Sequence, residues 1–222
     1  LPDWAEKKEY VNDFVIKKVV ENDLPRLKKV YGQELSHLLS VLITRPGQQV
    51  EIKNLAMDLG VSQNTIREYL DILEKTHLIS QVFNLGIGFR TRSVRQRKIY
   101  PSSVNAVVLK SFQGLGSDLW QRDMGLVIET FVHSYLLRKS NELYFWRQRQ
   151  IKEVDFIQVH SGEKLPIEIK YQNEIRPNDL RNLLYYCKKE HLKKAMVITK
   201  NEEKVITLEN IEIIFKPASS LL

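Results

Sequence analysis

The sequence contains a single cysteine, Cys187, and no apolar run approaching the ~18 residues that a membrane-spanning helix needs. A lone cysteine cannot form a disulfide within the chain, which is typical of proteins from a reducing compartment. We therefore expect a cytoplasmic protein without a membrane partner. A phosphate-binding loop is also missing, because none of the nine glycines is followed by lysine. The chain by itself is therefore not expected to bind ATP or to hydrolyse it.

Positive charge is in excess, with 34 Lys and Arg against 27 Asp and Glu, a net charge of +7 and a pI near 9.3. This excess is uneven: the net charge is +1 over residues 1–32, −2 over 33–77, +5 over 78–103 and +3 over 104–222. A short basic stretch of this kind permits a polyanionic partner. Its five cationic residues, with no acid among them, are Arg90, Arg92, Arg95, Arg97 and Lys98.

Residues 33–103 have the pattern of a winged helix-turn-helix domain, and residues 1–32 that of a helical connector leading into it. Apolar spacing predicts helices over 34–44 and 52–59, and a third helix with Ser62 as its N-cap. Strand-like residues 78–85 and 98–100 flank the glycine-containing basic loop, which would be the wing. A short turn between the second and third helices makes the third the candidate recognition helix.

Two parts of this domain are candidate contacts to DNA. The first turn of the third helix presents Gln63, Asn64 and Arg67, which could reach base edges, and the wing cations could contact phosphates. The rival interpretation of the helix is a protein contact, because three acids farther along it would repel phosphates. The rival interpretation of the wing is a solvated loop.

Residues 104–222 read as an α/β domain, so the fold class of the chain is α/β (α+β). A long helix is predicted over 119–139, and a shorter one from Asn178 or Asp179 to Lys189. The predicted strands are 143–147, 154–159, 165–171, 195–199 and 211–215, and the second and third of them form a hairpin around His160-Ser161-Gly162-Glu163.

The chemistry-bearing residues gather in this domain. Glu168 and Lys170 share one face of a strand, and the hairpin could bring Asp155 near Glu168. Two carboxylates beside an ammonium group suit a hard divalent cation, Mg²⁺ or Mn²⁺. Glu129 adds a carboxylate at the edge of the apolar stripe of the long helix, where burial without a partner is costly. The rival interpretation is a solvated strand face.

The order of these residues resembles the PD-(D/E)XK nuclease superfamily, and the segments Glu-Val-Asp-Phe and Pro-Ile-Glu-Ile-Lys resemble archaeal Holliday-junction resolvases. The whole chain resembles the C-terminal half of a prokaryotic AAA-type ATPase family, in which a winged helix and a nuclease-like domain follow the ATP-binding module. The segments that carry this likeness are Glu9-Tyr10-Val11, Asn22-Asp23-Leu24, Lys98-Ile99-Tyr100, residues 125–132, Tyr144-Phe145-Trp146-Arg147, residues 153–156 and residues 167–170.

This resemblance implies a restriction-endonuclease-like domain with a central mixed sheet and Mg²⁺-dependent hydrolysis of DNA. Asp155 and Glu168 would hold the metal, Lys170 would position or activate water, and Glu129 would be an additional ligand. It also implies that an ATPase module, which would bind the ATP, lies upstream of Leu1. One departure is Ser102, where the family often has aspartate.

Three other functions fit the sequence. The chain could be a non-catalytic DNA-binding or regulatory module of the ATPase, or an assembly module that oligomerises it. It could also be a winged-helix transcription regulator. Nuclease-like domains often bind without cutting, so the sequence leaves open whether the site turns over, and it leaves open a homo-oligomer.

Overall fold

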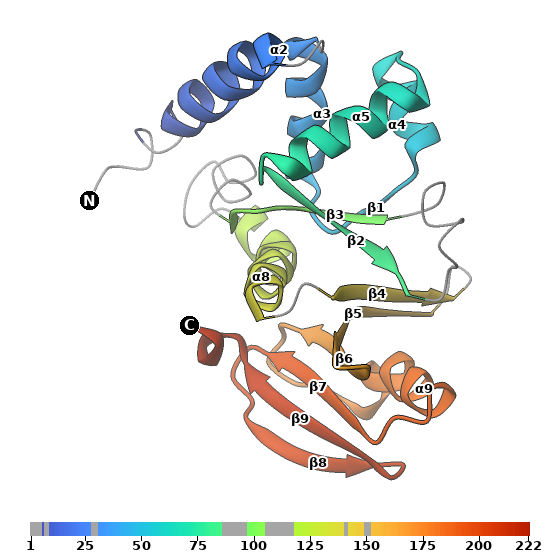
Figure 1. Ribbon diagram of the computed structural model, residues 1–222. Coiled ribbons are helices and arrows are strands. Elements are labelled where there is room, and N and C mark those ends of the chain that lie inside the picture. The colour runs from blue at the N-terminus through green and yellow to red at the C-terminus, as the bar shows by residue number, and fades with distance from the viewer. Residues whose placement is uncertain are drawn as a thin grey trace. The chain divides into compact units, whose positions relative to one another are not determined.

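The computed structural model describes Glu6 and residues 9–27, 31–85, 97–104, 118–139, 142–148 and 152–222 (Figure 1). These residues have a mixed α/β fold, as the sequence predicts, and they separate into two units. The first unit contains the described residues up to Gln81 together with those from Arg97 to Thr130. The second contains residues 82–85 and the described residues from Phe131 onward.

The first unit has the order of elements predicted for the winged helix. A strand that was not predicted lies between the helices expected over 34–44 and 52–59. It pairs antiparallel with the strand that follows the predicted wing. The wing residues Arg90, Arg92 and Arg95 lie outside the described residues. The elements are the π-helix η1 (Val11–Asp23), α2 (Leu24–Leu27), α3 (Gly32–Thr44), β1 (Gln49–Val50), α4 (Ile52–Leu59), α5 (Gln63–Lys75), β2 (Ile79–Asn84) and β3 (Arg97–Pro101).

The turn between α4 and α5 forms as its sequence predicts. Gly60 adopts a left-handed backbone with φ +69°, which ends α4 at little steric cost. The Ser62 hydroxyl then accepts a hydrogen bond of 3.0 Å from the backbone N–H of Thr65, so that one of the unsatisfied N–H groups of α5 has a partner.

Ser62→Ala is expected to lower the free energy of unfolding by about 1 kcal/mol, because the amide of Thr65 loses its cap. Urea denaturation of the purified chain measures this difference. Ser62→Asp, which restores an acceptor, is the matched control and should unfold at the wild-type urea concentration. Equal losses in both variants would contradict the assigned cap.

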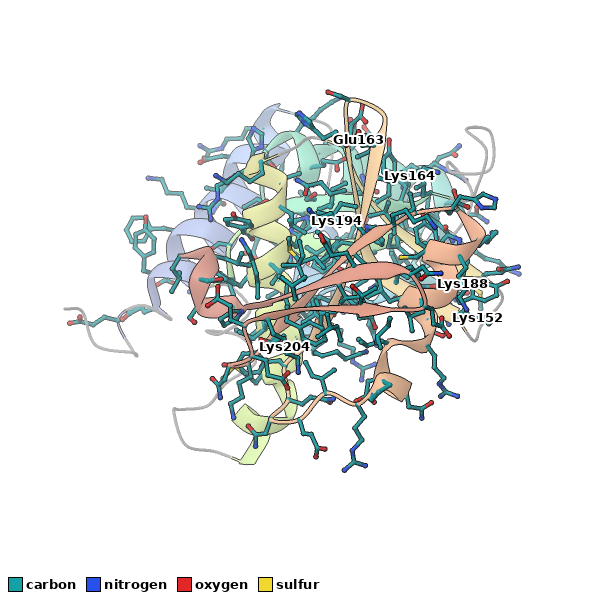
Figure 2. The ribbon with its side chains drawn as sticks, turned by 90° about the horizontal axis from the view of Figure 1, so that it is seen from below. Lys152, Glu163, Lys164, Lys188, Lys194 and Lys204 are labelled. Atoms are coloured by element: carbon teal, nitrogen blue, oxygen red, sulfur yellow. The ribbon has the colours of Figure 1, made fainter. Side chains whose placement is uncertain are left out.

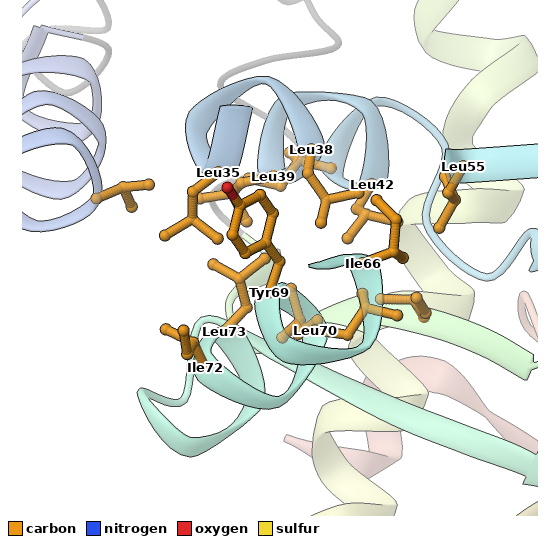
Figure 3. Packing of buried hydrophobic residues seen from close by; sticks show 14 of the residues in the cluster. Leu35, Leu38, Leu39, Leu42, Leu55, Ile66, Tyr69, Leu70, Ile72 and Leu73 are labelled. Atoms are coloured by element: carbon orange, nitrogen blue, oxygen red, sulfur yellow. The ribbon is translucent and has the colours of Figure 1, made fainter. Parts of the chain in front are cut away.

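Helices α3, α4 and α5 enclose the core of the first unit, as Figure 3 shows. Tyr69 lies in this core at 1% exposure, and its hydroxyl donates to Glu34 Oε2 at 2.7 Å. Burial and that hydrogen bond raise the pKa of Tyr69 to about 12. The core leucines lie at the helical spacing of the sequence, namely Leu35, Leu38, Leu39 and Leu42 on α3 and Leu70 and Leu73 on α5.

The second unit is built on a mixed sheet in the order β2-β4-β5-β6-β7-β9-β8. Strands β6, β7 and β9 run parallel, whereas β5 is antiparallel to both β4 and β6. The short strand β8 was not predicted from the sequence. The elements are β4 (Leu143–Gln148), β5 (Lys152–His160), β6 (Glu163–Lys170), the 3₁₀ helix η2 (Pro177–Leu180), α9 (Arg181–Lys189), β7 (Lys194–Thr199), β8 (Lys204–Leu208), β9 (Ile211–Pro217) and the 3₁₀ helix η3 (Ala218–Leu221).

Helix α9 packs against this sheet through Leu183, Tyr186 and Cys187, which share a core with Val197 and Phe215. Burial raises the pKa of the Cys187 thiol to about 11. The last long element, α8 (Asp118–Lys139), contributes residues to both units. Among the described helices, none is long and apolar enough to cross a membrane.

Candidate active site

The β5–β6 hairpin sets which residues of the two strands face each other. Its turn consists of Ser161 and Gly162, both with positive φ (51° and 84°), the geometry of a tight two-residue hairpin loop. Pairing runs from His160–Glu163 to Phe156–Ile167. The predicted hairpin is therefore confirmed, and its register carries Asp155 to the level of Glu168.

Strand β5 has one residue more than β4 where the two strands reach the site. Tyr144 pairs with Ile157, but Trp146 pairs with Val154, so that Asp155 and Phe156 both face Phe145. An extra residue of this kind is a β-bulge, which locally breaks the ladder and redirects a side chain. Pairing of β5 with β6 also ends here, at Phe156–Ile167, and just beyond it the Asp155 side chain accepts from the backbone of β6.

Asp155, Glu168 and Lys170 are brought together by this arrangement. Asp155 Oδ2 accepts a hydrogen bond of 2.8 Å from the backbone N–H of Ile169. Lys170 Nζ lies 2.7 Å from Glu168 Oε1. The three side chains lie near the carboxyl end of β6, where Lys170 is in register with Thr199 of the parallel strand β7. Crevices at the carboxyl ends of parallel strands are common ligand sites in α/β proteins.

The carboxyl group of Glu168 is costly to ionise. Its residue is 5% exposed, and among the described residues Oε2 has no hydrogen-bond partner. Burial, and next the charge of Asp155, raise the pKa of Glu168 to about 8, although Lys170 opposes this shift. For Lys170, burial alone would lower the pKa, but Glu168 and Asp155 outweigh it and the pKa is raised. The site therefore holds a charged Lys170 ammonium beside a carboxyl group that keeps its proton up to about pH 8.

The Glu168→Gln variant is expected to gain stability relative to wild type as the pH rises from 5 to 8. The folded state holds a proton on Glu168 up to about pH 8, whereas the unfolded chain releases it near 4.5. Within that window the folded state binds more protons, so wild-type stability falls with rising pH, by on the order of 1 kcal/mol per pH unit. Glutamine does not titrate, so the variant does not lose stability in this way. Urea unfolding across the pH range measures it, and parallel pH profiles for the two proteins would contradict the assignment.

The residues present fit a divalent metal ion. An unpartnered, buried carboxylate oxygen on Glu168, next to a second carboxylate, is the donor chemistry that Mg²⁺ and Mn²⁺ use. The described part of the chain contains no group of three or more His, Cys, Asp or Glu side chains arranged to hold a metal. Mg²⁺ is commonly held by one or two carboxylates, with waters and substrate phosphate oxygens completing its shell. Asp155 and Glu168 would be its protein ligands.

Glu129, predicted as an additional ligand, lies in the first unit and has other contacts there. Its Oε1 accepts hydrogen bonds from Lys98 Nζ at 3.0 Å and from Tyr100 Oη at 2.7 Å. A Cβ at Gly47 would lie 2.9 Å from the same oxygen, so only glycine fits this close turn, where φ is +72°. Glu129 therefore joins α8 to β3, and we do not carry it into the proposed metal site.

Two of the predicted wing cations are interior residues. Arg97 and Lys98 are 6% and 4% exposed. Arg97 Nη1 donates to Gln81 Oε1 at 2.7 Å, and Lys98 forms the ion pair with Glu129. Both residues belong to β3, whose described residues are all buried, rather than to a surface loop. We therefore leave them out of the proposed phosphate contacts.

The predicted base-reading residues do come together on α5. Gln63 and Asn64 are exposed in the first turn. Arg67 donates to both of them, at 2.8 Å to Asn64 Oδ1 and at 3.3 Å to Gln63 Oε1. These exchangeable surface hydrogen bonds leave the side chains accessible to a partner.

One residue near the site was missed by the sequence analysis. The charge of Asp179 contributes to raising the pKa of Lys170. Its own carboxylate accepts from the backbone N–H of Arg176 at 2.9 Å and so caps η2. An acid three residues after Arg176, in the turn before a predicted helix, was the available sequence signal.

Comparisons with known proteins identify domains without assigned functions. Residues 124–218 match a domain of unknown function (DUF4143), and residues 3–104 match another domain of unknown function (DUF8612). The chain is 30% identical over 164 residues to the uncharacterized proteins Rv2008c of Mycobacterium tuberculosis and Mb2031c of Mycobacterium bovis. The alignment covers 71% of this chain and 37% of each relative, so the chain spans little more than a third of their length. No solved structure gives a significant match.

Proposed function

We propose that the second unit is a metal-dependent nuclease that hydrolyses phosphodiester bonds in DNA. The observation that carries this proposal is the convergence of Asp155, Glu168 and Lys170, with a buried Glu168 oxygen that has no hydrogen-bond partner in the described part of the chain. Paired carboxylates beside a lysine suit phosphoryl chemistry, in which negative charge builds up on phosphate oxygens.

Each of the three residues has a separate role in this proposal. The bound cation would supply Lewis-acid stabilisation of the phosphate and lower the pKa of a water molecule. The carboxylate of Asp155 is held in place by the backbone N–H of Ile169. Glu168 presents its second oxygen from a buried position, and the Lys170 ammonium, 2.7 Å from the first oxygen, orients water and balances charge developing on the phosphate.

The proposal extends to the protein that contains this chain. The resemblance to the C-terminal half of AAA-type ATPases and the greater length of the mycobacterial relatives support a role as the DNA-processing end of an ATP-driven enzyme. The sequence itself has no phosphate-binding loop, so ATP would be bound elsewhere in such a protein.

The test is cleavage of labelled single-stranded, duplex and branched DNA by the purified chain in Mg²⁺ or Mn²⁺. We expect cutting with either metal, none in EDTA, and none by Asp155→Asn. Asparagine keeps the size of the side chain and an acceptor for Ile169 while removing the charge. Glu153→Gln on the same strand is the matched control, because Glu153 pairs with Arg147 and lies outside the site.

A second measurement separates loss of metal from loss of folding. Mg²⁺ or Mn²⁺ should raise the melting temperature of wild type and of Glu153→Gln but not that of Asp155→Asn. If the metal produces no shift and no DNA is cut under conditions in which DNA is bound, the nuclease proposal fails, and a non-catalytic DNA-binding module becomes the better description.

A further inference from the structure

A second concentration of positive charge lies in the second unit. Residues 176–200 contain seven Lys and Arg against two acids, Asp179 and Glu190, a net charge of +5. The remaining residues of 104–222 carry a net charge of −2, so the average over the whole domain hides this segment. Helix α9 lies inside it and has three basic residues and no acid.

The basic residues of α9 lie on its exposed side. Leu183, Tyr186 and Cys187 point into the core. The exposed positions, spaced i, i+4, i+7 and i+8, form one stripe along the helix about 12 Å long. They are Arg181, Tyr185, Lys188 and Lys189.

Aromatic rings interleave with these cations. Lys152 Nζ, from the start of β5, lies 3.2 Å from the centroid of the Tyr185 ring, and Lys189 Nζ lies 5.2 Å from that of Trp146. The two rings are 6.0 Å apart, and Tyr185 is 36% exposed. Figure 2 labels Lys152, whose ammonium lies over the ring of Tyr185 in α9, and Lys188, which is itself a residue of α9. Lys188 also pairs with Glu209 at 2.7 Å, so among the described residues the basic side chains of this surface without an ion-pair partner are Arg181, Lys189 and Lys152.

The stripe leads toward the candidate site. Lys164, near the start of β6, pairs with Glu190 just beyond the end of α9, so the helix runs antiparallel to the strand. The N-terminal end of α9, with Arg181, therefore lies toward the end of β6 that carries Lys170. Lys200 at the end of β7 donates to Asn173 in the segment after Lys170, which adds another cation at the same end of the sheet.

From this geometry we infer that the α9 stripe, with Lys152, binds the sugar–phosphate backbone of a nucleic acid strand and leads it to the Asp155–Glu168–Lys170 site. This inference rests on the proposed function, because it names how the substrate of that site is held. Cations along an exposed helix face neutralise phosphates, and an exposed tyrosine among them offers a face for a base.

The test is binding of a fluorescent oligonucleotide, single-stranded and duplex, to the full chain in EDTA over a series of salt concentrations. Arg181→Gln and Lys189→Gln should each weaken binding several-fold and lower the slope of log affinity against log salt by about 1. The matched control is Lys216→Gln, an exposed lysine on β9. Ile211, Ile213 and Phe215 of that strand face the α9 core, so Lys216 lies on the opposite side of the sheet.

Three outcomes would overturn the inference: unchanged binding in both α9 variants, the same loss in Lys216→Gln, or equally tight binding of poly-glutamate, which would indicate a site for acidic proteins. Circular dichroism and melting temperature establish that each variant is folded. Because EDTA removes cleavage from the assay, the two proposals fail separately. Cutting without α9-dependent binding overturns only this inference, and α9-dependent binding without cutting overturns only the nuclease.

Discussion

Alanine in place of Lys170 is expected to lower the rate of metal-dependent DNA cleavage by about 10²–10³-fold, with little change in DNA binding. The ammonium group lies 2.7 Å from Glu168 Oε1, so its loss removes charge stabilisation that matters most in the transition state. Single-turnover cleavage at saturating enzyme measures the chemical step. Binding of the same DNA in EDTA measures affinity separately.

Lys164→Ala is the matched control for Lys170→Ala. Lys164 lies on the same strand and also pairs with a glutamate, Glu190, but it is six residues from Lys170. Its removal should leave the cleavage rate within about twofold, since a partly exposed ion pair contributes little. A similar loss of rate in both variants would mean that the strand, rather than the Lys170 ammonium, had been disturbed.

Glu129→Leu is expected to lower the free energy of unfolding by about 3 kcal/mol. The change removes the carboxylate that both Lys98 and Tyr100 bond, while the Lys98 ammonium stays in an environment where its side chain is only 5% exposed. Breaking a buried pair by removing one partner commonly costs about 3–5 kcal/mol. The midpoint of urea unfolding measures this loss.

A double variant makes the prediction specific. Glu129→Leu combined with Lys98→Met removes both charges, and most of the lost stability should return. Cleavage by the double variant should retain its dependence on metal concentration. A normal urea midpoint together with lost cleavage in Glu129→Leu would contradict the structural role and return Glu129 to the metal site.

Local signals allowed much of the fold to be predicted from the sequence. The predicted bounds of α4 agree with the structure, and the cap at Ser62 forms as expected, because glycine and serine determine the backbone around them. Strand β8 was missed because its five residues, none of them buried, have no strong apolar alternation. Strand β1 is only two residues long and is defined by its partner β3.

Part of the candidate site could also be predicted from local signals. Hairpin register follows from a two-residue turn, and this was enough to expect Asp155 near Glu168. The contacts of Glu129 with Lys98 and Tyr100 join residues 31 and 29 positions apart, and no local pattern encodes them. The burial of Lys98 likewise depends on the packing of α8. A basic run in the sequence could therefore not show that Arg97 and Lys98 are buried.

The bulge in β5 has a consequence for the relatives of this chain. The position of the Asp155 carboxylate depends on the number of residues between Val154 and Ile157 as well as on the aspartate itself. A chain shortened by one residue here would pair without interruption, and each side chain beyond that point would turn to the other face of the sheet. A homologue can thus keep the aspartate, the glutamate and the lysine and still have no site. Alignments of this chain with its relatives should be inspected for strand length at this point before the candidate site is transferred from one protein to another.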